Sequence, residues 1–192
     1  MTKILFAGAA SLVLLAACGQ QPGNSEPANA VQDAASAPVG QMSASTLGAN
    51  TVGGFIPSMA MSDMYEIKAG EIAARRSSNA EVKALAAMLI ADHTASSAKL
   101  KSLAPASAPD VMVPTTLDER RQGMLDNLTS ASDADFDRVW LTQQEAAHNE
   151  ALTLLNGFSD NTDAPPLAAL AGEAIPKVTM HRDRAREIMA KM

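Results

Sequence analysis

The chain has 192 residues, a net charge of −6 at pH 7 and an aromatic content of 3%. This length allows one domain with a sizeable core plus appendages. Its acidic balance and the lack of a basic stripe argue against a nucleic-acid partner, and its single cysteine excludes an intrachain disulfide.

The first eighteen residues have the layout of a secretion signal. Lys3 provides a basic start, and residues 4–15 form an apolar run that is too short to span a bilayer. Residues 15–18, Leu-Ala-Ala-Cys, resemble the lipobox of bacterial lipoproteins, in which cleavage leaves Cys18 as the lipidated first residue. The alternative is an ordinary cleaved signal in which the cysteine has no role.

The lipobox predicts an exported, periplasmic protein that is held at the membrane through Cys18. Gly19 follows the cysteine. In enteric bacteria, an aspartate at this position retains lipoproteins at the inner membrane. Because this chain has glycine there, we expect the outer membrane to be the more favoured location. The sequence does not identify a protein partner.

Residues 19–55 consist mainly of Ala, Ser, Pro, Gly, Gln and Asn. So little apolar material does not offset the entropy cost of ordering a chain, so we predict a disordered tether here. The folded domain is predicted to cover residues 56–192.

This domain is rich in alanine and shows no alternation of polar and apolar residues long enough for a strand, so we predict an all-α fold. The second helix starts at the N-cap Asn79 and ends before Pro105. Pro176 is expected to kink the last helix. The predicted helices cover residues 58–76, 79–103, 116–128, 132–158 and 165–188, the third being a short helix in the crossover that opens with a capping box at Thr116.

Each of the three histidines lies on the apolar face of a different long helix. His148 shares its face with Glu145, three residues earlier, because residues at i and i+3 are neighbours on a helix. Glu66 of the first helix and His93 of the second lie at similar heights, about 5 Å apart along the bundle axis. Glu145 lies at the height of His181. A carboxylate on a buried face requires a cation, a proton or a metal to satisfy it.

These five residues, Glu66, His93, Glu145, His148 and His181, predict one buried metal site. Three imidazoles and a carboxylate suit Zn, Fe or Mn. The alternative is that each histidine is a core residue hydrogen-bonded to a carboxylate or hydroxyl.

Asp92 is adjacent to His93, and adjacent residues do not face each other on a helix, so we expect Asp92 to support the site without binding the metal. Glu145 and His148 form the only Glu-x-x-His motif, which argues against a di-iron carboxylate centre. No nucleophile or glycine-rich phosphate loop is recognisable, so we do not predict an enzyme.

Several segments together resemble the bacterial domain of unknown function 4142 family. They are YEIKAGEIAARRSSNAEVKALA (65–86), DHT (92–94), VPTTLDERRQGMLDNL (113–128), FDRVWLTQQEAAHNEAL (136–152) and IPKVTMHRDRARE (175–187). The resemblance covers residues 63 to 188 and implies a ferritin-like four-helix bundle located in the cell envelope. It implies no activity. The proline-containing segment 102–112 is longer than in the family pattern.

Two hypotheses from different classes follow. The leading one is a lipid-anchored periplasmic bundle that binds one divalent metal. Its rival is a metal-free structural or interaction lipoprotein, in which the buried glutamates and histidines share protons.

Overall fold

The computed structural model describes residues 26–45 and 51–192, and over these residues it is all-helical, as predicted. The predicted signal and Cys18 lie outside the described residues. None of the described helices has the length and apolar character of a membrane span. The six described helices are α1 (Glu26–Ser43), α2 (Val52–Arg76), α3 (Ala80–Ser107), α4 (Glu119–Ser130), α5 (Phe136–Phe158) and α6 (Pro165–Met189).

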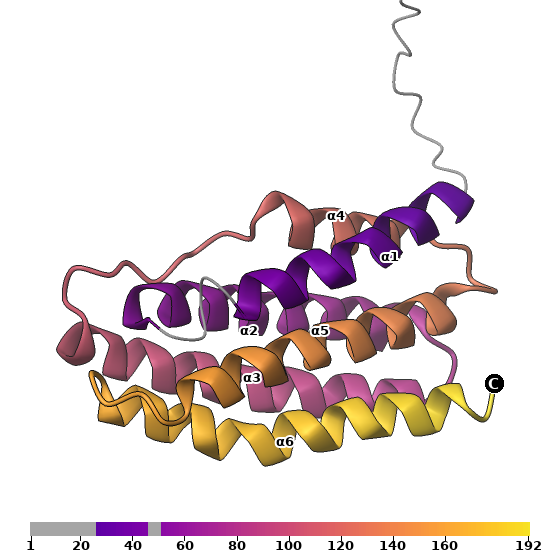
Figure 1. The fold of residues 1–192 in the computed structure, drawn as a ribbon. Helices are drawn as coiled ribbons and strands as arrows, with labels where there is room; N and C mark the ends of the chain where they lie inside the picture. Colours follow the sequence, from indigo (N-terminus) through magenta and orange to yellow (C-terminus); the bar gives the residue numbers. More distant parts are fainter. Residues whose placement is uncertain (1–25, 46–50) are drawn as a thin grey trace, which may run out of the picture.

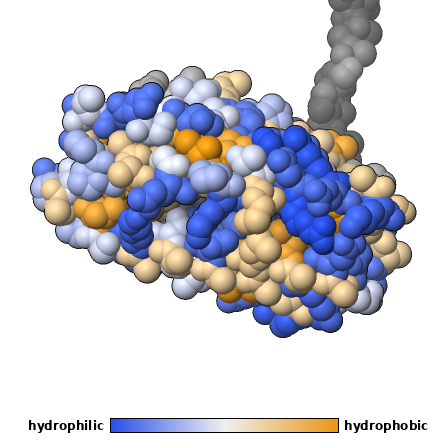
Figure 2. Space-filling view, turned by 90° about the horizontal axis from the view of Figure 1, so that it is seen from below, coloured by the Kyte–Doolittle hydropathy of each residue, from blue (hydrophilic) through white to orange (hydrophobic). Residues whose placement is uncertain are grey.

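The four long helices α2, α3, α5 and α6 lie alongside one another in a bundle (Figure 1). Helix α2 packs against α3 and α5, and α6 packs against the same two helices, so each long helix has two long neighbours. Helix α4, in the connection from α3 to α5, packs on α2 and α5, and α1 lies over α4 and α5. Hydrophilic and hydrophobic residues are interspersed on the face seen in Figure 2, as is usual for a solvent-facing surface.

Helix α1 corrects part of the predicted disordered segment 19–55, because residues 26–43 are helical and packed. Residues 19–25 and 46–50 of that segment lie outside the described residues. The contacts that hold α1 are polar. Asp33 accepts hydrogen bonds from Asn127 Nδ2 at 2.7 Å and from Gln143 Nε2 at 2.5 Å. By contrast, Val31 and Val39 are exposed. Low apolar content therefore failed as a criterion here, because hydrogen bonds to α4 and α5 hold the helix in place.

Capping groups explain where the first helices begin. Thr51 Oγ1 accepts a hydrogen bond from Gly54 N at 3.0 Å, so α2 begins at Val52, before the predicted residue 58, and contains Pro57. Asn79 caps α3 as predicted, its Oδ1 accepting from Glu81 N at 2.8 Å. Helix α3 continues beyond the predicted end at residue 103 to Ser107 and includes Pro105.

Of the three later helices, only α4 begins at a side-chain cap. Asp118 caps α4 by accepting from Arg121 N at 2.7 Å, so the predicted cap at Thr116 is two residues too early. Ser132 Oγ accepts from Asp135 N at 3.2 Å, but α5 begins at Phe136, four residues after the predicted start, and its N-cap Asp135 makes no side-chain capping bond. Helix α6 begins at the proline pair as predicted and runs as one element through Pro176.

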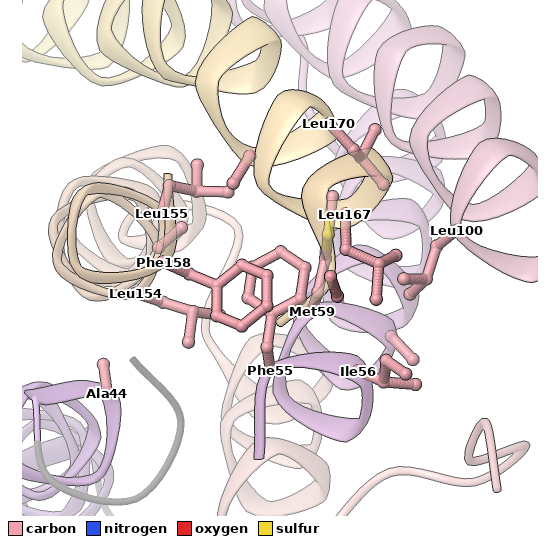
Figure 3. Packing of buried hydrophobic residues seen from close by; sticks show 14 of the residues in the cluster. Ala44, Phe55, Ile56, Met59, Leu100, Leu154, Leu155, Phe158, Leu167 and Leu170 are labelled. Carbon is pink, nitrogen blue, oxygen red and sulfur yellow. The ribbon is translucent and has the colours of Figure 1, made fainter. Parts of the chain in front are cut away.

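The core consists of two apolar clusters, one toward each end of the bundle. The first contains the stacked rings of Phe55 and Phe158, whose centroids are 3.9 Å apart (Figure 3). The second contains Tyr65 and Trp140, and Trp140 Nε1 donates to Ala69 O at 3.1 Å.

A buried polar layer lies between these two clusters. Along α3, His93 lies between Leu89 of the second cluster and Leu100 of the first. The same is true of His148 between Leu141 and Leu152, and of His181 between Ala185 and Val178. The packing of apolar residues above and below therefore brings the three histidines to one height.

Candidate metal centre

Three histidines from three helices meet in the middle of the bundle. His93 of α3, His148 of α5 and His181 of α6 each contribute one ring nitrogen to a group whose members all lie within 4.8 Å of one another. The ring centroids are 5.5 to 5.9 Å apart. All three side chains are buried, at 6%, 1% and 1% exposure. We refer to these residues as the histidine cluster.

In each ring, one nitrogen is held by a group outside the cluster. His93 Nδ1 bonds to Asp63 Oδ1 at 2.8 Å, and His181 Nε2 bonds to Asp92 Oδ2 at 3.0 Å. His148 Nδ1 donates to the backbone oxygen of Gln144 at 2.7 Å. The second nitrogen of each ring, namely Nε2 of His93, Nε2 of His148 and Nδ1 of His181, is buried without a hydrogen-bond partner among the described residues.

This pattern is the one that metal-binding histidines show. A ligating imidazole usually donates its other N–H to a carboxylate or a backbone carbonyl, which fixes its tautomer and its orientation. A buried nitrogen without a hydrogen-bond partner lowers the stability of the fold, because its desolvation is not compensated. Here three such nitrogens lie close together. A cation that accepts all three lone pairs would remove this loss of stability.

Burial favours the neutral, ligating form of two of the rings. It lowers the pKa of His148 well below 6.5, and it also lowers the pKa of His181, with the charge of His93 adding to the effect. Burial acts in the same direction on His93, but the hydrogen bond to Asp63 and the charge of Glu66 outweigh it and raise the pKa of that imidazole.

Glu66 lies beside the histidine cluster without belonging to the group of close ligand atoms. Its side chain is 2% exposed, and its Oε1 is 3.8 Å from His148 Nδ1, the nitrogen that already bonds to Gln144. Its Oε2 has no hydrogen-bond partner among the described residues. Burial raises the pKa of Glu66 to about 7, so this carboxyl group is poised to hold or release a proton near neutral pH.

Glu145 corrects the sequence prediction, because it does not reach the cluster. It lies at the surface with its side chain 41% exposed, and its Oε1 accepts from Arg186 Nε at 2.8 Å. The buried face of α5 extends instead through Gln144 to Gln143, since α1 and α4 cover that side of the helix. Gln143 donates to Met124 O in α4 at 3.1 Å.

Asp92 lies beside the histidine cluster, where it contacts His181 rather than His93, its neighbour in sequence. It pairs with His181 and with Lys177, both on α6, while Asp63 supports His93. Asp63 was missed by the sequence analysis. Its spacing of three residues before Glu66 places the two carboxylates on one face of α2, and that spacing was the available signal. The Gln144 contact uses a backbone oxygen, so no residue type could have indicated it.

Comparison with known families adds one finding. The family model described as a domain of unknown function, DUF4142, matches residues 37–188. The chain belongs to this family. The DUF4142 match begins within α1 and includes the whole histidine cluster together with Asp63, Glu66 and Asp92. No curated protein and no solved structure matches the chain.

Proposed function

We propose that this DUF4142 protein is a lipid-anchored protein of the bacterial cell envelope whose helical bundle binds one divalent metal ion. The ligands are His93, His148 and His181. The supporting observation is that every ring has one nitrogen fixed from outside the cluster and a second that lacks a partner. Three imidazoles suit Zn, Fe or Mn. Glu66 serves as an adjacent carboxyl group rather than a necessary ligand.

The arrangement of the helices agrees with a ferritin-like four-helix bundle. Four long helices surround one core, and the long connection from α3 to α5 carries the short α4. Metal sites in such bundles are built from inward-facing side chains at one height, as the histidine cluster is. Periplasmic location and attachment, with the outer membrane favoured, rest on the signal layout and on Cys18.

Elemental analysis tests the proposal. Protein purified without chelators should contain about one metal ion per chain, because three imidazoles form one mononuclear site. His148→Ala should abolish that content. Glu145→Gln is the matched control on the same helix and should retain it, since Glu145 faces Arg186. Metal-free wild-type protein, after growth with Zn, Fe and Mn supplied, would refute the proposal.

A second candidate is a metal-free structural or interaction lipoprotein. It is favoured by the carboxylate–histidine pairs Asp63–His93 and Asp92–His181 and by the raised pKa of Glu66, which together could share protons. In that case chelators would leave the melting temperature unchanged.

A further inference from the structure

A small cavity lies against the histidine cluster. Its volume is about 40 Å³, and its lining includes His93 and His181 together with Asp63. Most of the remaining wall is apolar, with Met59, Leu155 and Val178 among its residues. The cavity therefore adjoins two of the three histidines of the proposed metal site, and neither His148 nor Glu66 is part of its lining.

The size of the cavity restricts what it can hold. A water molecule requires roughly 10–15 Å³ of such space, so the cavity accommodates about three or four non-hydrogen atoms. Asp63 Oδ2 is buried without a hydrogen-bond partner among the described residues, although its Oδ1 is engaged by His93. This oxygen can accept a hydrogen bond from a ligand in the cavity.

The cavity also has a route to the surface. Lys177 is part of its lining, and the Lys177 side chain is 57% exposed. The Lys177 ammonium pairs with Asp92 at 2.8 Å, so an ion pair between α6 and α3 spans this side of the cavity. Breaking a solvent-exposed ion pair of this kind costs little free energy, which leaves the route open to small molecules.

We propose that the metal is an open centre, and that this cavity delivers a small oxygen-donor ligand to it. The proposal rests on the proposed function. Three protein ligands leave a coordination position free, as in metal centres that activate a bound water. The ligand is water, hydroxide or a peroxide. An oxygen atom of this ligand would bind the metal, and Asp63 Oδ2 would accept a hydrogen bond from the ligand's O–H group. The small volume favours ligands of this size.

Azide binding to cobalt-loaded protein tests this proposal. Azide has three non-hydrogen atoms and fits the cavity, and its coordination to Co(II) changes the visible absorption. Wild-type protein holding one cobalt per chain should show a saturable spectral change on azide addition. Ala174→Leu fills the cavity from α6 and should weaken azide binding more than about tenfold while leaving the cobalt content unchanged.

Two further variants complete the experiment. Ala169→Leu makes the same substitution at an exposed position of α6 and should bind azide like the wild type. Ser96→Leu fills the cavity from α3 and replaces Ala174→Leu if that variant does not fold.

The outcomes separate the two proposals. An unchanged spectrum in cobalt-loaded wild-type protein would overturn the open centre and leave the metal site standing. Equal azide affinity in the wild type and in the cavity-filled variant would also overturn it, since the ligand would then reach the metal by another route. A wild-type protein that takes up no cobalt contradicts the metal site itself, and the open centre with it.

Discussion

At the scale of single residues, the surroundings of each histidine decide what its imidazole can do. Asp63 and Asp92 hold His93 and His181 by their carboxylates, whereas His148 is held only by a backbone oxygen. No carboxylate is hydrogen-bonded to His148, although Glu66 lies 3.8 Å from its Nδ1, and burial lowers the pKa of this imidazole well below the ordinary value. It is the ring most available as a neutral ligand.

The stability of the metal-free protein should depend on pH through His148 and Glu66 in opposite directions. The folded pKa of His148 lies below 6.5, so its contribution is present above pH 6.5 and is lost on acidification. The folded pKa of Glu66 is about 7 against an ordinary 4.5, so its contribution is present below pH 4.5 and is lost as pH rises through 7.

Urea unfolding with chelator at pH 7 and pH 5 measures both contributions. When the pH falls from 7 to 5, the free energy of unfolding of His148→Gln should decrease less than that of the wild type. That of Glu66→Gln should decrease more, and each difference should be on the order of 1 kcal/mol. Parallel changes in all three proteins would show that neither group titrates as its surroundings dictate.

Glu66, which was predicted as a ligand from its height along the bundle, lies beside the cluster and outside the group of close ligand atoms. Helical spacing was sufficient to predict that the three histidines face inward, because the period of a helix fixes which residues share a face. It failed for Glu145. Gln144 and Glu145 lie four and three residues before His148, so on the helix they project to either side of the His148 side chain. Only the packing of α1 and α4 against α5 determines which of these two sides is buried. That packing is tertiary information, and spacing within one helix does not contain it.

At the scale of helices, local capping groups can be recognised from the sequence, whereas long-range polar contacts cannot. Asn79 is a local cap and could be recognised from sequence. Helix α1 was not recognised from its composition, and the hydrogen bonds that hold it are long-range, because Asp33 reaches Asn127 and Gln143 about a hundred positions later in the chain. Pro57, Pro105 and Pro176 all lie inside helices, so proline alone did not mark their ends.

Replacing Asp33 should release α1 without unfolding the bundle. Asp33→Ala removes the acceptor of both hydrogen bonds, so amide hydrogen exchange over residues 26–43 should become at least about tenfold faster, while exchange in α3 and α6 stays the same. Val31→Ala is the control, because Val31 is 70% exposed. Unchanged exchange in Asp33→Ala would mean that other contacts hold this helix.

At the scale of the whole molecule, the histidine cluster divides the core. Apolar residues fill the bundle on both sides of it, and the layer between them contains Asp63, Glu66 and the three histidines. A metal bound to His93, His148 and His181 would join α3, α5 and α6 at this layer. Since binding occurs only in the folded state, its free energy adds to stability, by about 4 kcal/mol at a concentration a thousandfold above Kd.

Thermal unfolding with and without a chelator tests this account most directly, with His148→Ala as the control that lacks a ligand. We expect the chelator to lower the melting temperature of the wild type by at least about 5 °C, and added metal to restore it. His148→Ala should melt at the same temperature in both conditions. A wild-type melting temperature that neither chelator nor added Zn, Fe or Mn changes would contradict the metal site and favour a proton-sharing core.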